Sequence, residues 1–339
     1  MRFAVVGAGA IGGYLGARLA LAGEDVTFVA RGANLEALRR VGLRLIEPDG
    51  AERVARTARA APISEPGEFD VIFLGVKAQQ VAALAKDVSR LFAKETAVVT
   101  LQNGLPWWYF HKLAGPYEGR PIHAVDPDGA IAANIPPARV VGAVVYPAAE
   151  LIAPGVVKVI EGDRFTLGEP DGTKSDRASA ISEALTRGGL KAPVSSDIRA
   201  EIWLKLWGNI VFNPVSALTH ATLVDICQFP LTRGLAVEMM TEAQTVAEKL
   251  GARIRLSIDR RIAGAEAVGS HKTSMLQDVE AGRPLELEAL VGSVVELARL
   301  TETPTPAIDA VYACTSLLAE TLAPDGRLAI NRQSEPGSR

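Results

Sequence analysis

One lysine and two asparagines recur at a four-residue spacing in an otherwise apolar stretch. Lys205, Asn209 and Asn213 lie within residues 201–220, where most of the neighbours are apolar. In a helix this spacing places all three side chains on one face. Burying an ammonium and two amides without partners costs several kcal/mol, so these groups need polar partners or a polar cleft. Partial burial lowers the pKa of a lysine, which suits a proton donor, although a lysine reaching solvent beside two structural asparagines explains the spacing equally well.

A second polar group of residues flanks a predicted break between two helices. Ser274 precedes Gly282 and Pro284, which end one helix and begin the next, and Glu286 follows them. Ser274 could bind a carboxylate or a hydroxyl, and Glu286 could accept a hydrogen bond from a hydroxyl. Capping is the alternative, because a glutamate in a first helical turn is favoured by the helix dipole without any ligand.

The first residues of the sequence predict a site for a dinucleotide. An apolar run at 3–6, a G-x-G-x-x-G turn and a helical pattern over 11–21 follow one another. In this order they form the first unit of a dinucleotide-binding fold, in which the helix N-terminus binds the pyrophosphate. An ordinary turn between a strand and a helix is the alternative. The predicted pyrophosphate-binding residues are Gly7, Gly9, Ala10, Ile11 and Gly12.

Three further residues follow predicted strands and bear on the choice of dinucleotide. An NAD site usually has an acidic residue at the end of the second strand, whereas this chain has Arg31 there, which could pair with a 2′-phosphate. Lys77 follows the third strand and could add charge in the same crevice. Asn103 follows the fourth and could reach the nicotinamide or a substrate carbonyl. These positions favour NADPH as cofactor, with a solvated arginine and a turn-forming Asn-Gly as the alternatives.

The elements that must position these residues change in type along the chain. Strands at 3–6, 25–30, 70–76 and 96–101 alternate with helices at 11–21, 34–40 and 79–92, and further strands are predicted at 140–146, 156–160 and 164–167. Six helices then follow without an intervening strand, at 199–218, 231–250, 256–267, 274–281, 286–301 and 305–322. The pattern predicts an α/β Rossmann domain with a mostly parallel sheet, followed by an all-α domain. We place the domains at 1–196 and 197–325, with a frayed tail at 326–339.

Composition fits an ordinary globular enzyme and excludes several other classes. Of the 339 residues, 48% are hydrophobic and 22% charged, and the formal net charge is −3, so no nucleic-acid partner is indicated. The two cysteines have no metal-type spacing, and we expect no metal site. No apolar segment approaches the roughly 20 residues that span a bilayer, and no signal-peptide pattern opens the sequence. We therefore expect a soluble, cytoplasmic protein.

Taken together, these motifs resemble the ketopantoate reductase (2-dehydropantoate 2-reductase) family over nearly the whole chain and in order. The matching segments are G-A-G-A-I-G-G at 7–13, V-A-R-G at 29–32, V-K-A at 76–78, L-Q-N-G at 101–104, W-x-K-L-x-x-N-x-x-x-N-P at 203–214 and S-M-L-Q-D at 274–278, with Glu286 following.

The resemblance implies a Rossmann domain, a helical domain like the C-terminal domain of 6-phosphogluconate dehydrogenase, and NADPH as cofactor. It further implies reduction of ketopantoate to pantoate in pantothenate and coenzyme A biosynthesis, with Lys205 as the general acid. The residues that it places around a small 2-oxo acid substrate are Asn103, Asn209, Asn213, Ser274 and Glu286. Three other interpretations stay open: a reductase of another small 2-oxo acid, an amine-forming relative of the opine type, and a non-catalytic NADPH-binding sensor.

One segment departs from the family pattern. Trp107, Trp108 and Tyr109 follow Asn103 closely, and bulky aromatic residues near the pocket could narrow it or change its substrate. The long helices at 231–250 and 305–322 could supply the face of a homodimer, although apolar helices equally suit a core.

Overall fold

The computed structural model describes residues 1–65 and 67–323. The chain divides into two compact units, the first comprising Met1–Glu201 and the second beginning at Ile202. The division falls inside one long helix, α6 (Ile198–Thr219). The tail predicted at 326–339 lies outside the described residues.

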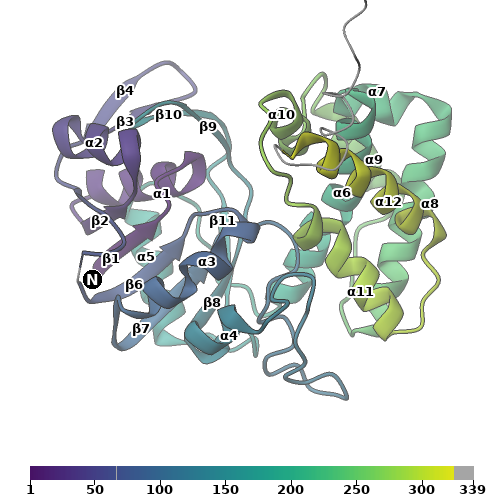
Figure 1. Ribbon diagram of the computed structural model, residues 1–339, viewed down its shortest axis with the longest axis horizontal. Coiled ribbons are helices and arrows are strands. Elements are labelled where there is room, and N and C mark those ends of the chain that lie inside the picture. The colour runs from purple at the N-terminus through teal and green to yellow at the C-terminus, as the bar shows by residue number, and fades with distance from the viewer. Residues whose placement is uncertain (66, 324–339) are drawn as a thin grey trace, which may run out of the picture. The chain divides into compact units, whose positions relative to one another are not determined.

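A mostly parallel sheet forms the centre of the first unit (Figure 1). Its strands, within the described residues, are β1 (Arg2–Val6), β2 (Asp25–Val29), β5 (Arg59–Ala61), β6 (Phe69–Leu74), β7 (Phe92–Thr100), β8 (Val140–Val145) and β11 (Phe165–Gly168). Their order is β11-β8-β7-β6-β1-β2-β5, and β11 alone runs antiparallel to its neighbour. The carboxyl ends of β1, β2, β6 and β7 therefore lie at one edge of the sheet, where ligands of such folds bind.

Helix α1 (Ala10–Leu21) is buried between this sheet and a smaller one. The second sheet has the order β4-β3-β10-β9, from β3 (Leu43–Ile46), β4 (Glu52–Ala55), β9 (Ala148–Ala153) and β10 (Val156–Glu161). Two glycines of α1 allow the close packing. A Cβ on Gly16 would lie 2.4 Å from the ring of Phe28 in the main sheet, and one on Gly13 would lie 2.8 Å from Val157 in the small sheet.

The other helices of the first unit are α2 (Gly32–Val41), α3 (Ala78–Ser89), α4 (Ala130–Asn134) and α5 (Asp176–Arg187), with a short 3₁₀ turn η1 (Pro137–Arg139). Helix α5 packs against α1 and β11, and α3 contacts α4. Both α2 and α3 begin just after a strand, at the carboxyl edge of the sheet.

The second unit is helical throughout its described residues. After α6 come α7 (Leu223–Gln228), α8 (Pro230–Lys249), α9 (Ile258–Ala267), α10 (Ser274–Glu280), η2 (Glu288–Gly292), α11 (Ser293–Leu300) and α12 (Pro306–Leu322). Trp203 and Trp207 of α6 are fully buried, and the indole of Trp207 donates a hydrogen bond to the carbonyl of Met240 in α8. No helix among the described residues has the length and apolar character required to cross a bilayer.

The predicted fold class is confirmed, and the differences lie in short elements. The strands β3, β4, β5 and β9 and the short helices α4 and α7 were not predicted from the sequence. The helix predicted at 286–301 is divided, because η2 has π-helical hydrogen bonding before α11 begins. Helix α6 continues through Pro214 to Thr219.

A glycine in β8 makes room for an aromatic side chain, and its replacement tests this packing. A Cβ on Gly142 would lie 2.6 Å from the ring of Trp108, so we expect Gly142→Ala to lower the free energy of unfolding by about 1–3 kcal/mol. The control is Gly234→Ala in α8, where a Cβ meets nothing within 4 Å and alanine is the better helix former. Chemical denaturation of both variants is the measurement, and equal stability of the two would contradict the packing argument.

Candidate functional site

Three segments meet at the carboxyl edge of the main sheet, and glycines allow them to touch. Gly7, directly after β1, has a φ of +97°, and a Cβ there would lie 2.6 Å from the side chain of Val76. A Cβ on Gly75, directly after β6, would lie 2.7 Å from the carbonyl oxygen of Gly7. A Cβ on Gly12 would lie 2.2 Å from the same oxygen. The glycine turn is therefore packed against the end of β6 at distances that no side chain would permit.

The start of α1 fits a bound pyrophosphate. A Cβ on Gly9 would meet nothing within 4 Å, so space is open beside this part of the turn. Gly9 is the N-cap of α1, and glycine has no side chain to cap the helix. The N–H groups in the first turn, those of Ala10, Ile11 and Gly12, therefore donate no hydrogen bond to an N-cap side chain. Such groups bind anions well.

Two cationic residues follow strands at the same edge. Arg31 is the N-cap of α2, just after β2, and its exposed side chain makes no ion pair with the described residues. Lys77 is the N-cap of α3, just after β6, and its backbone N–H donates to Oε1 of Gln80 at 3.2 Å. An acidic residue at position 31 would repel a 2′-phosphate, and this chain has an arginine there.

Asn103 follows β7 in a tight turn, and the residue before it was missed by the sequence analysis. Gly104 has a φ of +91°, which the turn requires. Nε2 of Gln102 donates to the carbonyl oxygens of Leu74, at 2.8 Å, and Val76, at 2.9 Å. The Q-N-G motif was the available signal, but the sequence analysis used its asparagine alone.

A second missed residue fixes the glycine turn from the other side. Nδ2 of Asn34 in α2 donates to the carbonyl oxygen of Ala8 at 2.8 Å, and its Oδ1 accepts from the N–H of Gly155 at 2.7 Å. One amide therefore joins the glycine turn to the β9–β10 hairpin. Because the two partners lie 26 and 121 residues away in the sequence, no local pattern indicates this contact.

In the second unit, α6 carries the predicted lysine and both asparagines. Lys205 and Asn209 are partly buried, and Asn213 is 5% exposed, at positions one helical turn apart. Desolvation lowers the pKa of Lys205 from 10.5 to about 8, against the opposing effect of the Glu286 carboxylate. The structure therefore brings the charges of Lys205 and Glu286 within interacting distance.

Ser274 does not cap α10, because the residue before it does. Thr273 is the N-cap of α10, and its hydroxyl accepts the N–H of Leu276 at 3.2 Å. Ser274 is the first helical residue, and its exposed hydroxyl makes no hydrogen bond with the described residues. Glu286 precedes η2, and π-helical segments are often found at functional sites.

The aromatic segment after Asn103 is packed inside the first unit. Trp108 and Tyr109 are 1% and 0% exposed, Trp107 is 7% exposed, and the indole of Trp108 donates to Oγ1 of Thr100 in β7 at 3.2 Å. The expectation that these rings narrow an open pocket is wrong for Trp108 and Tyr109, because side chains covered on all sides do not line one. The sequence pattern could not show this, since the space that Trp108 fills depends on a glycine in a distant strand.

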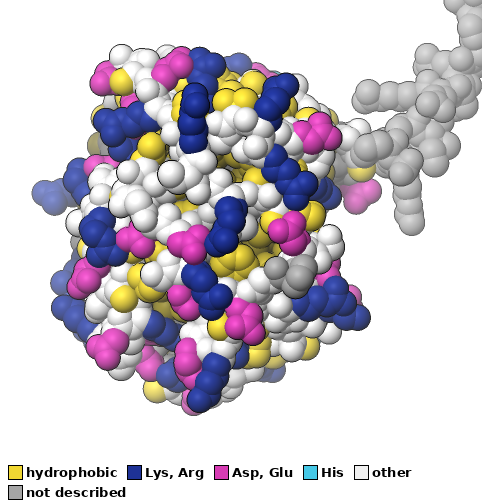
Figure 2. Space-filling model, turned by 90° about the vertical axis from the view of Figure 1, so that its left-hand side faces the viewer, with side chains coloured by type: hydrophobic (Ala, Val, Ile, Leu, Met, Phe, Trp, Pro, Cys, Tyr) yellow, Lys and Arg dark blue, Asp and Glu magenta, His cyan; other side chains and the backbone are white. Residues whose placement is uncertain are grey.

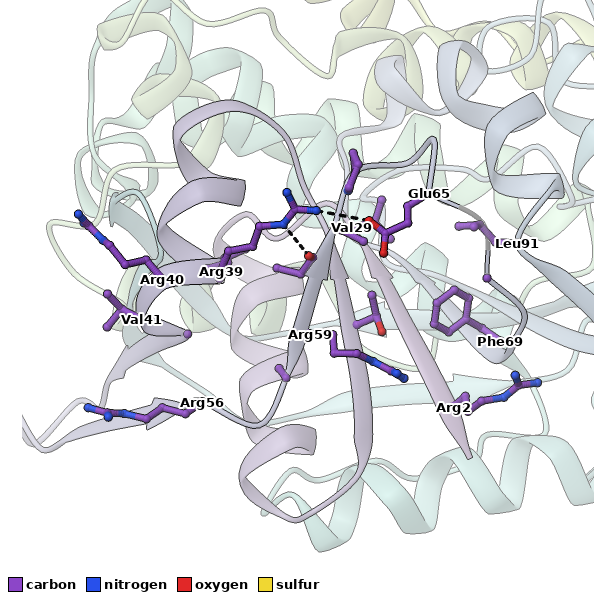
Figure 3. A pocket seen from close by; sticks show the side chains of 18 of the residues that line it. Arg2, Val29, Arg39, Arg40, Val41, Arg56, Arg59, Glu65, Phe69 and Leu91 are labelled. Atoms are coloured by element: carbon purple, nitrogen blue, oxygen red, sulfur yellow. Dashed lines mark hydrogen bonds and ion pairs between the residues drawn. The ribbon is translucent and has the colours of Figure 1, made fainter.

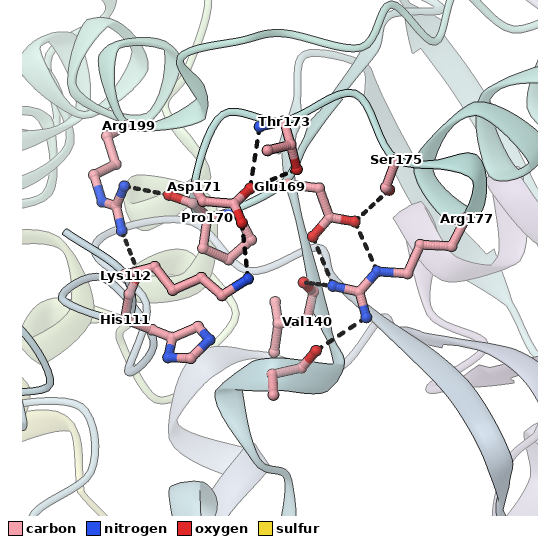
Figure 4. Close-up of polar contacts among 11 residues, drawn as sticks. His111, Lys112, Val140, Glu169, Pro170, Asp171, Thr173, Ser175, Arg177 and Arg199 are labelled. Carbon is pink, nitrogen blue, oxygen red and sulfur yellow. Dashed lines mark hydrogen bonds and ion pairs between the residues drawn. The ribbon is translucent and has the colours of Figure 1, made fainter. Parts of the chain in front are cut away.

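A partly buried arginine at the start of α6 holds the same segment (Figure 4). The guanidinium of Arg199 donates to the carbonyl oxygens of Tyr109, at 2.7 Å, of His111, at 2.6 Å, and of Pro170. Nearby, Lys112 has a φ of +54° and its ammonium pairs with Asp171 at 2.7 Å, which lowers the pKa of that carboxyl group. These contacts hold residues 109–112 of the loop that follows β7.

A second arginine in Figure 4 serves the scaffold. Arg177 of α5 forms a two-pronged ion pair with Glu169, with Nε–Oε1 and Nη2–Oε2 distances of 2.7 and 2.6 Å. It also donates to the carbonyl oxygens of Ala138 and Val140, so it joins α5 to the start of β8. The hydrogen bonds to the Glu169 carboxylate raise the pKa of Arg177.

A cavity of about 650 Å³ lies beside β2, β5 and α2 (Figure 3). The arginines that line it are Arg2, Arg39, Arg40, Arg56 and Arg59. None of the predicted site residues is among its lining residues in the described part of the chain.

Acidic residues offset most of the positive charge around this cavity. Arg2 pairs with Asp70 at 3.9 Å, Arg39 with Glu65 at 3.3 Å and Arg59 with Asp25 at 2.8 Å. Glu65 and Glu68 line the cavity, and Asp25 and Asp70, outside the lining, pair with two of its five arginines. Figure 2 shows the same mixture over one whole face, with Lys and Arg side chains interspersed among Asp and Glu. The cavity is therefore nearly neutral and is not a strong site for an anion.

Two family models match the chain. Residues 3–172 match the model described as ketopantoate reductase PanE/ApbA, and residues 197–319 match that of its C-terminal domain. A 2-dehydropantoate 2-reductase of Mesorhizobium japonicum is 53% identical over 94% of this chain and 98% of its own length. One of Archaeoglobus fulgidus is 31% identical over 87% of this chain and 90% of its own length.

Solved structures share the whole fold. A crystal structure from Ralstonia solanacearum MolK2, solved as a candidate ketopantoate reductase, has a TM-score of 0.90 and 43% identity, covering 94% of this chain and 98% of that one. The 2-dehydropantoate 2-reductase of Methylococcus capsulatus has a TM-score of 0.81 at 26% identity, covering 95% and 98%. D-mandelate dehydrogenase, solved with NADH and anilino(oxo)acetate, reaches 0.81 at 22% identity, covering 95% and 99%, which shows a common fold alone.

The electrostatic pairing in the second unit can be measured directly. We expect the Lys205 ammonium to titrate near pH 8, and Glu286→Gln to move this titration to lower pH, because the carboxylate raises the pKa. NMR of isotopically labelled lysine side chains is the measurement, with the Lys205 signal assigned from Lys205→Arg. Glu288→Gln is the control, since Glu288 lies two residues further on and bonds to Tyr312. A Lys205 titration that Glu286→Gln leaves unchanged would refute the pairing.

Proposed function

Because the chain belongs to the ketopantoate reductase family, a family of oxidoreductases, we propose that it reduces 2-dehydropantoate (ketopantoate) to pantoate with NADPH. The observation that carries this proposal is the partly buried Lys205, whose pKa of about 8 leaves it protonated and able to give up a proton near neutral pH. A protein that only senses NADPH has no need of such a group.

The residues of the first unit suit NADPH. We assign the pyrophosphate to the turn and first helical residues at 7–12, and the 2′-phosphate to Arg31, with Lys77 and Asn103 completing the cofactor site. The open space at Gly9 supports the assignment, as does the exposed Arg31 guanidinium, which forms no ion pair with residues 1–65 or 67–323. When bound, NADPH supplies the hydride that reduces the substrate carbonyl. The proposed NADP-binding domain is 1–196 and the proposed substrate domain 197–325.

Lys205 acts on the oxygen of that carbonyl. Negative charge develops on the oxygen as the carbonyl is reduced, and an ammonium stabilises this charge before it delivers the proton. Desolvation makes the proton easier to release, and the Glu286 carboxylate keeps the amine protonated. The two effects oppose each other, and their balance places the pKa where an acid is most useful.

The remaining polar residues hold the substrate. Asn209 and Asn213 continue the face of α6 that carries Lys205, where their amides can orient a polar ligand. The Ser274 hydroxyl, which is not used in capping α10, can bind the substrate carboxylate. Glu286 can accept a hydrogen bond from the distal hydroxyl of ketopantoate, and Asn103 can orient the carbonyl.

The rate of NADPH oxidation with ketopantoate tests the proposal. We expect turnover that falls as the pH rises through about 8, because the acid is then deprotonated. Lys205→Met should lower kcat by about 10²–10⁴, while its melting temperature equals or exceeds that of the wild type, since a desolvated charge has been removed. If the wild-type enzyme were active only on other 2-oxo acids, the proposed substrate would be wrong. If Lys205→Met kept its activity, Lys205 would not be the general acid.

Arg31 should determine the choice between the two dinucleotides. We expect Arg31→Ala to raise KM for NADPH by about tenfold to a hundredfold, matching the ~1.5–3 kcal/mol of a charge-assisted hydrogen bond. KM for NADH should change little, because NADH has no 2′-phosphate. Arg40→Ala, which removes another exposed arginine from α2, is the control. Equal effects on both dinucleotides would show that Arg31 does not read the phosphate.

A further inference from the structure

Gln102 joins two segments to which the proposed function assigns cofactor-binding residues. Its Nε2 donates to the carbonyl oxygen of Leu74, the last residue of β6, and to that of Val76. Lys77 follows Val76 in the chain, and Asn103 follows Gln102. Building on the proposed function, we infer that Gln102 is a positioning residue, which holds the Lys77 segment in register with the Asn103 segment.

The Gln102 side-chain amide joins the two segments beyond the end of the β6–β7 pairing. The parallel pairing of β6 with β7 ends at Leu74 and Thr100, and the Leu101 N–H then donates to the Leu74 carbonyl at 3.2 Å. Beyond it the two chains lead into a helix on one side and a turn on the other. With both N–H groups of Nε2 engaged at 2.8 and 2.9 Å, the orientation of the Gln102 amide is fixed as well.

The same bond extends to the glycine turn. Val76, whose carbonyl Gln102 holds, lies against Gly7 so closely that a Cβ on Gly7 would come within 2.6 Å of its side chain. Gln102 therefore holds residues 75–77, a segment that contacts the proposed pyrophosphate site and includes Lys77. A shift of residues 75–77 would disturb both.

The competing explanation is that Gln102 only stabilises the fold. The state of its side-chain oxygen, Oε1, argues against this explanation. Oε1 of Gln102 is buried and has no hydrogen-bond partner in the described structure. An unsatisfied buried acceptor costs about 1–3 kcal/mol, which an apolar side chain of similar volume would avoid. Residues that are costly in the scaffold are expected where function requires them.

The test measures NADPH affinity by the fluorescence of the bound dinucleotide, so it needs no turnover. Gln102→Met keeps most of the volume and removes both donors, whereas Gln102→Glu replaces the donors with a carboxylate facing two carbonyl oxygens. We expect Kd for NADPH to rise about tenfold in Gln102→Met and further in Gln102→Glu. Gln244→Glu is the matched control for the change in charge and should leave Kd unchanged, because Gln244 is a partly exposed residue of α8 whose amide donates to Glu248.

A double-mutant cycle separates positioning from general destabilisation. If Gln102 acts through Lys77 and Asn103, then Gln102→Met should weaken binding far less in a Lys77→Ala or Asn103→Ala background than in the wild type. Additive effects in both backgrounds, or a lowered melting temperature with unchanged Kd, would overturn the inference. If Gln102→Glu fails to fold, Gln102→Met decides. Lack of activity on ketopantoate would refute the proposed substrate and leave this result standing.

Discussion

The absence of side chains at Gly7, Gly12 and Gly75 is the constraint on which the first unit depends. These glycines let the turn after β1, the start of α1 and the end of β6 approach within distances that any Cβ would prevent. Only then can the carbonyl of Val76 lie where Gln102 reaches it, and the N-terminus of α1 lie at the carboxyl edge of the sheet. The order of the strands supplies the edge, and the glycines make it compact enough for one ligand to contact several loops.

The second unit solves a different physical problem, the burial of a charge. Lys205 lies among apolar residues of α6, and Trp203 and Trp207 are fully buried on the same helix. Desolvation alone favours the neutral amine, and the Glu286 carboxylate limits this effect, so the pKa falls to about 8 and no further. A residue chosen for stability would carry no charge there. The lysine at this position is consistent with the proposed role, which needs both a proton and the means to release it.

Elements with strong local patterns could be predicted from the sequence, and those that depend on distant partners could not. Apolar runs flanked by glycine indicated β1 and β6, and helical periodicity indicated α6 and α8. Of the small sheet only β10 was predicted. The charged residues Arg44 of β3 and Glu52 and Arg53 of β4 lie in a stretch that resembles solvated surface, and the pairing of β3 with β10 is long-range. In the proposed site, motif residues such as Lys77 and Asn103 were identifiable. Gln102 stands in the Q-N-G motif, but its bonds to the carbonyl oxygens of Leu74 and Val76 join it to another segment, as the bond from Asn34 to Ala8 does, and no local pattern specifies these contacts.

The fold alone does not determine the substrate, because D-mandelate dehydrogenase has the same fold at 22% identity. Nor can the aromatic residues after Asn103 determine it by lining a pocket, since Trp108 and Tyr109 are covered on all sides. Their effect is indirect: together with the Arg199 guanidinium they fix the loop that follows Asn103. We therefore propose that substrate choice resides in polar side chains that the scaffold does not use. Ser274 meets this condition, because Thr273 already caps α10 and leaves the serine hydroxyl available for a ligand.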